Sequence, residues 1–207
     1  LHGGRKYTTS TDKEFRPLLR ALLKRRRAQL MVNTTHFEHW FLLFALRDGV
    51  TSSLWRFKPI VSPPDRFWAD PHVLQRDGRF FVFIEELFYA SSTGRISVLV
   101  VAQDGILSGP KPVQEEPWHL SFPFIFEHGG QCCMVPESAQ NRRIALYRCE
   151  SFLDQWKLHR ALMENVSAVD TVPHFQDARW WMFTNFVEAS GASSCDKLCL
   201  FGAETLD

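Results

Sequence analysis

The sequence has 207 residues, which suits one domain or one and a half, and its 45% hydrophobic and 23% charged residues are ordinary for a globular protein. It holds no run of about 18 apolar residues, which excludes a membrane-spanning helix of the usual kind from these residues. The net charge is only +1, and basic and aromatic residues do not interleave on one face, which argues against nucleic-acid binding.

The N-terminal part is basic and predicts one helix. Residues 1–30 hold nine Lys/Arg and two Asp/Glu, a net charge of +7, whereas the rest of the chain carries −6. Apolar residues recur at helical spacing over 15–30, and Pro17 favours a helix start one residue before it. The basic face is either solvated or bound to an anionic membrane surface or phosphate-rich partner. We predict a basic helical segment over residues 1–35 and a second domain over residues 36–207.

From about residue 36, short apolar runs alternate with turns, and the 14% aromatic residues suit strands or flat surfaces that carry ligands. An internal repeat is present in this part. Three segments begin with a proline at the head of an apolar run: "DPHVL" at Pro71, "FPFIF" at Pro123 and "VPHFQ" at Pro173, at spacings of 52 and 50. Each is followed by a turn, a second strand and a third strand.

Acidic residues keep the same register within these repeats. Glu85 and Glu137 each lie 14 residues after the proline, and Asn185 takes their place in the third repeat, whose turn we expect to be two residues shorter. Units of about 50 residues with up to four short strands are typical of β-propeller blades. A Greek-key sandwich is the alternative, but it would not repeat proline, turn and acid in register.

We therefore predict an all-β propeller preceded by an amphipathic helix, with blade repeats starting near residues 71, 123 and 173. Three to four blades fit in this length, and a ring closes with four or more. We expect further blades C-terminal to the sequence, and the late first methionine, Met31, likewise indicates a fragment.

Functional candidates lie at the blade entrances, because inner strands of a propeller line its central channel. Asp70, His119, Ser121 and Asp170 are expected to meet at one end of the channel, and Glu85 and Glu137 either reach the same place or cap turns. Carboxylates accept hydrogen bonds from sugar hydroxyls, and aromatic rings stack on sugar C–H faces. The candidate ligand-binding residues besides the acids are Trp68, Trp118, His119, Ser121 and His174.

Each candidate also has a structural alternative. Asp70 and Asp170 are equally suited to accept hydrogen bonds from amides at the strand starts, and His174 can be a polar strand residue. A pair of these carboxyls could also act as acid and base on a glycosidic bond if one pKa were raised. The five cysteines lack a paired C-x-x-C spacing and read as reduced core residues. No phosphate loop, Ser-His-Asp order or metal-ligand spacing is found, so we expect no metal and no cofactor.

Several segments closely resemble the N-terminal domain of the plant and bacterial glucosamine inositolphosphorylceramide transferases, over about Phe67 to Asn185. They are "FWADPHV", "DGRFFVFIEE", "EPWHLSFPFIFEHGGQCCMVPES", "IALYRCESFLDQWKL" and "WWMFTN". That domain is similar to the five-bladed propeller of arabinanase, invertase and levansucrase glycosidases. The resemblance implies five blades and a glycan-related role, with sugar transfer assigned to a separate C-terminal domain in the plant proteins.

The resemblance also assigns roles to single residues. Asp70 matches the aspartate that serves the glycosidases as base or nucleophile, and Asp170 resembles the aspartate that tunes the acid or holds the sugar. Their general-acid glutamate would lie beyond Asp207, which leaves Glu137 as the substitute within this chain.

We expect a carbohydrate-recognising propeller domain accessory to glycolipid or polysaccharide glycosyl transfer. Its partners would be a glycan or glycolipid head group and a fused or separate transferase domain, with an anionic surface as a further contact of the basic helix. A glycoside hydrolase or transglycosidase and a non-catalytic protein-interaction propeller are the alternatives. A bacterial protein of this kind would be cytoplasmic, and a plant-type protein with an N-terminal anchor would face the Golgi lumen.

Overall fold

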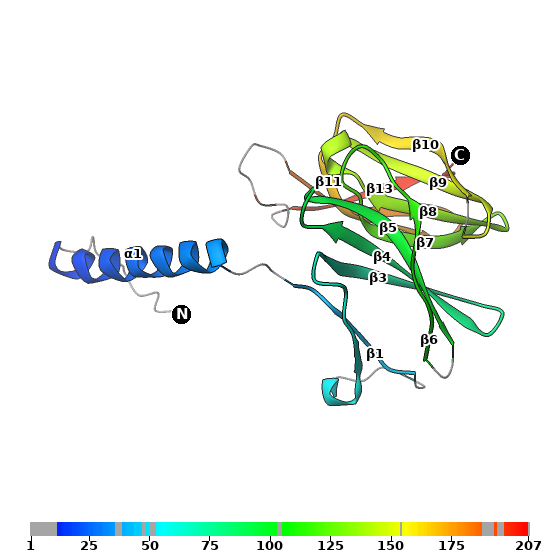
Figure 1. Ribbon diagram of the computed structural model, residues 1–207. Coiled ribbons are helices and arrows are strands. Elements are labelled where there is room, and N and C mark those ends of the chain that lie inside the picture. Colours follow the sequence, from blue (N-terminus) through cyan, green and yellow to red (C-terminus); the bar gives the residue numbers. More distant parts are fainter. Residues whose placement is uncertain are drawn as a thin grey trace. The chain divides into compact units, whose positions relative to one another are not determined.

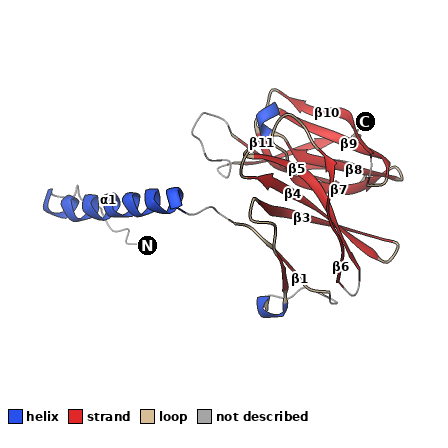
Figure 2. Cartoon of the chain, viewed as in Figure 1, coloured by secondary structure: helices blue, strands red, loops and turns tan. Residues whose placement is uncertain are grey.

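The computed structural model describes residues 12–35, 39–46, 49, 53–102, 105–153, 155–187, 193 and 197–206. The chain divides into two units between His39 and Trp40. The first contains a helix and the second consists mainly of strands (Figure 2). The predicted boundary at residue 35 stays a prediction.

The helix α1 spans Asp12–Thr35. The predicted helix is therefore confirmed, but its predicted start is wrong, because α1 begins before Pro17 and holds this proline inside. Proline without an N–H deprives an earlier carbonyl of its helical donor, and the helix continues across that gap. Within the described part of the chain, no helix is long and apolar enough to cross a membrane.

In the second unit, consecutive strands of the same sheet pair antiparallel (Figure 1). A hairpin of β1 (Leu42–Phe44) and β2 (Lys58–Ile60) comes first. Blade 1 consists of β3 (Arg66–Arg76), β4 (Arg79–Phe88), β5 (Thr93–Ala102) and β6 (Gly105–Gln114). Blade 2 consists of β7 (Ser121–His128), β8 (Gln131–Glu137), β9 (Arg143–Ser151) and β10 (Gln155–Glu164). Blade 3 consists of β11 (Ala168–Gln176), β12 (Arg179–Phe186) and β13 (Leu198–Ala203).

Single 3-10 turns lie at Leu54–Arg56 and Ala139–Asn141. In each blade the strands follow one another in chain order across the sheet, without the crossover of a Greek key. Among the first strands of the blades, β7 lies beside both β3 and β11. The propeller prediction is therefore confirmed and the sandwich alternative is wrong, whereas the predicted number of five blades stays a prediction.

The core lies between successive sheets, so blades 1 and 2 bury residues on both of their faces, whereas blade 3 packs on blade 2 and leaves Leu198 and Leu200 exposed. Neighbouring residues of one strand enter different clusters: in β4, fully buried Phe83 packs toward blade 2 and fully buried Ile84 packs toward the β1–β2 hairpin. In β8, Met134 packs toward blade 1 and Cys133 toward blade 3. Strands with both faces buried read as continuous apolar runs, which explains sequences such as "FFVFI" and "CCMV".

A bulge interrupts the inner strand of every blade at the same place. Two residues there face one residue of the neighbouring strand, between the paired positions Ala69 and His72, Ser121 and Phe124, and Val169 and Val172. The first bulge residues are Asp70, Phe122 and Asp170, with φ of 48°, 43° and 53°. Aspartate tolerates this left-handed region, whereas phenylalanine is rare in it.

The bulges correct the predicted register of the third repeat. Ala69, Ser121 and Val169 pair with Glu85, Glu137 and Asn185, so the equivalence of Asn185 is confirmed. The expected shortening of the third turn is wrong, because all three hairpins turn over two residues. Thr171 occupies the place of Pro71 and Pro123, and Pro173 lies two residues further along the strand. The bulge rather than the proline is the repeated element.

Candidate functional site

The structure brings four predicted carboxyls together at the inner ends of the three blades. Asp70 and Asp170 occupy bulge positions, whereas Glu85 lies within β4 and Glu137 is the last residue of β8. Their charges act on one another: the charge of Asp70 adds to the burial that raises the pKa of Glu85, Glu137 and Asp170. We call these four residues the carboxyl cluster.

Two members of the cluster tie one blade to the next. The backbone N–H of Phe122 donates to Oδ2 of Asp70 at 3.3 Å, and the backbone N–H of Asp170 donates to Oε2 of Glu137 at 3.3 Å. In each pair the donor is the bulge residue of the following blade. The structural alternative, a bond to an amide at the strand start, is therefore present for Asp70. It does not exclude a second role, because a carboxylate has about four lone-pair sites.

Glu85 is the most enclosed carboxyl of the cluster, with 6% of its surface exposed. Burial and the charges of Asp70 and Glu137, together with a hydrogen bond to Asp70, raise the pKa of Glu85 to about 8. Nε2 of His119 lies 3.3 Å from its Oε1. The buried carboxyl is thus mostly protonated at neutral pH.

The pKa of Glu137 is set by effects that act in opposite directions. Burial and the charges of Asp170 and Asp70 raise its pKa to about 7, although hydrogen bonds from the Asp170 amide and the Ser121 side chain oppose the rise. Ser121 is buried and pairs with Glu137 across β7 and β8. Glu137 can therefore give or take a proton near neutral pH.

A cavity of about 230 Å³ opens beside Asp70, between the entrances of β3 and β7. This volume is below the range of about 300–1,000 Å³ for sites of drug-sized ligands, so the cavity suits a small ligand. Asp70 provides its acidic side. The other lining residues are Pro71, His72, Phe122, Pro123 and Phe124.

The aromatic side of this cavity was not among the predicted site residues. The ring of His72 meets the ring of Phe124 edge-on at 4.8 Å, and burial lowers the pKa of His72. The sequence could have indicated Phe122, because it lies 52 residues after Asp70 and therefore at the equivalent position of the next repeat.

Three predicted ligand residues lie elsewhere. Trp68 is buried in the core beside the β1–β2 hairpin, and its Nε1 donates to Glu86 at 3.4 Å. Trp118 packs on the core between blades 1 and 2, where its indole N–H is buried without a hydrogen-bond partner among the described residues. His174 is exposed four residues beyond Asp170 and takes no part in the bonds that join the carboxyls. We place none of the three in the candidate site.

Glu86, the neighbour of Glu85, points to the opposite face of β4, as alternation along a strand requires. Its side chain is fully buried and accepts hydrogen bonds from Arg66 (3.0 Å), Arg95 (3.0 Å) and Ser97 (2.8 Å). Burial alone would raise the pKa of Glu86, but these bonds together lower it. Glu86 is therefore an ionised structural residue.

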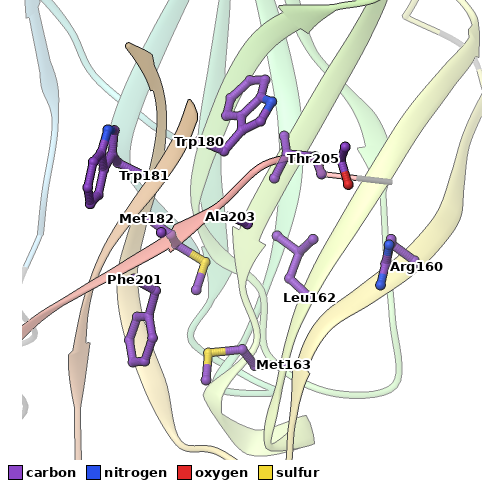
Figure 3. A pocket seen from close by; sticks show the side chains of 11 residues that line it. Arg160, Leu162, Met163, Trp180, Trp181, Met182, Phe201, Ala203 and Thr205 are labelled. Carbon is purple, nitrogen blue, oxygen red and sulfur yellow. The ribbon is translucent and has the colours of Figure 1, made fainter. Parts of the chain in front are cut away.

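A second cavity, of about 330 Å³, lies between blade 2 and blade 3 and is mainly apolar (Figure 3). Two tryptophans and two methionines line it, with Arg160 among the few polar residues. None of the carboxyl cluster lines this cavity. It therefore offers nothing for acid–base chemistry or for the recognition of many hydroxyls. Within the described residues, no group of three or more His, Cys, Asp or Glu is placed to hold a metal ion.

Two comparisons of sequence identify relatives of the chain. A family model described as "Glucosamine inositolphosphorylceramide transferase 1, N-terminal" matches residues 59–206. Glucosamine inositolphosphorylceramide transferase 1 of Arabidopsis thaliana is 27% identical over 154 residues, which cover 66% of this chain and 20% of that protein. The protein of the same name from Oryza sativa subsp. japonica is 27% identical over 152 residues, 67% of this chain and 20% of that one. The chain thus spans about a fifth of the length of these curated relatives.

Comparison with solved structures supports the fold. The crystal structure of exo-β-1,3-galactanase from Phanerochaete chrysosporium with β-1,3-galactotriose aligns with a TM-score of 0.53 and 10% identity. The alignment covers 69% of this chain and 34% of the galactanase. At this identity the likeness concerns the propeller fold alone.

Proposed function

The chain belongs to the family described as glucosamine inositolphosphorylceramide transferase 1, N-terminal, and on this premise we propose that it recognises a glycan or glycolipid head group as an accessory to glycosyl transfer. Membership makes it a carbohydrate-related domain. The observation that carries the finer proposal is the convergence of Asp70, Glu85, Glu137 and Asp170 beside a small cavity with an aromatic wall. A transferase domain, fused or separate, would be the partner.

The chemistry of the cavity fits a sugar. Asp70 can accept hydrogen bonds from hydroxyl groups, and the rings of Phe122 and Phe124 offer apolar surface for the C–H face of a sugar ring. Both kinds of group lie on the same cavity. The proposal takes the carboxyls as binding groups and requires no bond to be broken.

Binding of glucosamine, N-acetylglucosamine and β-1,3-galactotriose, measured by calorimetry, tests this proposal. Asp70→Asn and Asp170→Asn are expected to weaken binding at least about tenfold, because charge-assisted hydrogen bonds are roughly twice as strong as neutral ones. Asparagine tolerates the positive φ of both positions, so the bulges should persist. Asp77→Asn, in an exposed turn with φ 50°, is the matched control. Unchanged affinity in both cluster variants would instead favour a protein-interaction propeller.

A glycoside hydrolase or transglycosidase is the second candidate, favoured by a carboxyl that can donate a proton near neutral pH and that lies close to a second, solvent-exposed carboxyl. Glu137, with a pKa of about 7, would be the acid and Asp70 the base or nucleophile. Turnover of an aryl glycoside that is lost in both Glu137→Gln and Asp70→Asn would support this candidate. Binding without turnover would exclude it for the sugars tested.

The helix α1 provides a separate binding surface. Phe15, Leu18, Leu19, Leu22 and Leu23 are each between 42% and 61% exposed, and basic residues such as Arg20 and Lys24 accompany them. Such a helix fits an anionic lipid surface. The wild-type chain should sediment with phosphatidylserine vesicles, and the combined replacement Arg20→Glu and Lys24→Glu should abolish this binding. The control Lys58→Glu should still bind. Equal binding of the wild type to purely zwitterionic vesicles would contradict the charge argument.

A further inference from the structure

Contacts link the backbone of blade 1, through His119 and Glu85, to Asp70. We propose that His119 and Glu85 are positioning residues, which hold Asp70 as an oriented carboxylate at the end of this chain of donors. The inference rests on the proposed function, in which Asp70 meets the ligand.

The first link fixes the tautomer of His119. The backbone N–H of Gly94 donates to Nδ1 of His119 at 2.9 Å, and a backbone amide nitrogen can act only as a donor. Nδ1 therefore carries no proton, and the neutral ring holds its single proton on Nε2. A methyl group on Gly94 would come within 2.8 Å of Cε1 of His119, so glycine is what allows the ring to approach.

The second link makes Glu85 an acceptor. Nε2 of His119 lies 3.3 Å from Oε1 of Glu85. Because His119 is neutral and carries its proton on Nε2, it can donate a hydrogen bond to Glu85 at this distance, and the contact is not an ion pair. Burial lowers the pKa of His119, although the charge of Asp70 acts in the opposite direction.

The third link makes Glu85 a donor. Two carboxyls share a hydrogen bond only when one of them keeps its proton. Glu85 is 6% exposed, whereas Asp70 is exposed to solvent, so Glu85 holds the proton and Asp70 the charge. The hydroxyl of Glu85 then donates to Asp70.

Asp70 receives its other protein donor from blade 2, the amide of Phe122 at 3.3 Å. Two donors fill about half of the roughly four lone-pair sites of a carboxylate. The remaining sites can accept hydrogen bonds from a ligand in the cavity that Asp70 lines. The carboxylate is thus held in place by both blades before a ligand arrives.

The groups that face this chain make it sensitive to pH. Asp70, Glu137 and His119 face Glu85, and Asp170 faces both Asp70 and Glu137. Once the pH exceeds the value of about 8 to which the pKa of Glu85 is raised, Glu85 loses its proton. It then stops donating to Asp70 and repels it, so ligand binding weakens.

One arm of the test needs no ligand. We expect nitrogen NMR of the full chain to show His119 protonated on Nε2 and bare at Nδ1, and carbon NMR to show Glu85 titrating near pH 8. Protonation of Nδ1, or titration of Glu85 near its ordinary value of 4.5, would overturn the inference whatever the protein binds. If the chain of bonds is found but no sugar binds, the inference stands and the proposed function fails.

The other arm measures the affinity for N-acetylglucosamine, which does not titrate in this range. Wild-type affinity should fall about tenfold between roughly pH 6.5 and pH 9, as expected for the loss of a charge-assisted hydrogen bond. Glu85→Gln should remove the loss centred near pH 8 and leave only any change near pH 7 that comes from Glu137, because an amide accepts from His119 and donates to Asp70 at every pH. Glu85→Leu should bind weakly throughout. Glu127→Gln, on exposed surface of β7, should follow the wild type. The same pH-dependent loss in Glu85→Gln would refute the role of Glu85.

Discussion

The adjacent residues Glu85 and Glu86 should respond in opposite ways to the same substitution by glutamine. Both side chains are buried, with 6% and 0% of their surface exposed. Glu85 faces other carboxyls, which together with burial raise its pKa, whereas hydrogen bonds from Arg66, Arg95 and Ser97 lower that of Glu86. Each is the natural control for the other.

For Glu85, the folded protein holds the proton more tightly than the unfolded chain does. Its contribution is most favourable below pH 4.5 and is lost as the pH rises through about 8. At about 1.4 kcal/mol per pH unit, the loss reaches roughly 3 kcal/mol at pH 7 and up to about 5 kcal/mol above pH 8. Because glutamine does not titrate, Glu85→Gln should gain stability relative to wild type by these amounts as the pH rises.

For Glu86, the contribution to the free energy of unfolding depends on pH in the opposite direction. Its depressed pKa stabilises the fold above the ordinary value of 4.5, and this contribution is lost as the pH falls through the folded value. Breaking a buried ion pair costs about 3–5 kcal/mol. Arg66 and Arg95 keep second partners in Asp65 at 2.8 Å and Glu115 at 3.2 Å. We therefore expect Glu86→Gln to cost about 2–3 kcal/mol at neutral pH and less in acid.

Urea unfolding of the two variants and the wild type, followed by tryptophan fluorescence at roughly pH 5, 7 and 9, gives the free energies of unfolding. The difference between Glu85→Gln and wild type should grow with pH, and that between Glu86→Gln and wild type should shrink in acid. The reasoning is refuted if the two variants change stability with the same sign at neutral pH, or if the Glu85→Gln difference does not vary with pH.

Three further predictions concern packing, each measured as a free energy of unfolding. Gly94→Ala should cost about 2–3 kcal/mol by overpacking, because a Cβ would lie 2.7 Å from a backbone oxygen, whereas Gly109→Ala meets nothing within 4 Å and should be near neutral. Thr184 donates to a strand carbonyl, so Thr171 must be the donor in their 2.8 Å contact. Thr184→Val should therefore cost about 1–3 kcal/mol, because it leaves both the Val169 carbonyl and the Thr171 hydroxyl without this hydrogen-bond partner. Thr171→Val should cost less, because it removes a partner from Thr184 alone. Phe83→Ala, at a fully buried position between blades, should cost about 3–5 kcal/mol, and a cost below 1 would contradict the blade packing.

The repeat allowed the sequence to predict the blades and the meeting of Asp70 and Asp170, and it left open whether Glu85 and Glu137 reach the same place or cap turns. The equivalence of Asn185 to the two glutamates also followed from it. These residues recur at a fixed distance from a strand start, and the inner ends of blades lie together in a propeller. Nothing more than spacing is required for such a prediction.

What spacing could not decide is the face of a strand to which a side chain points. Trp68 seemed suited to a ligand, but it shares the face of Glu86 and is buried in the core. The fully buried strand "FFVFIEE" has no polar–apolar alternation, so Glu85 and Glu86 look equivalent until their partners on neighbouring strands are known. The predicted turn of the third repeat was too short because Pro173 lies two residues beyond the bulge position that Pro71 and Pro123 occupy in the other blades.

In each blade the bulge residue lies at the entrance of the inner strand, apart from the residues of that strand that pack in the core. Each bulge lets the inner strand offer one side chain at the entrance without changing the alternation that fills the core on either side. The three positions hold Asp70, Phe122 and Asp170, residues as different as an acid and a large aromatic, on otherwise equal hairpins. A single substitution at one of these three positions therefore changes the side chain at one blade entrance and leaves the pairing of the hairpin unchanged.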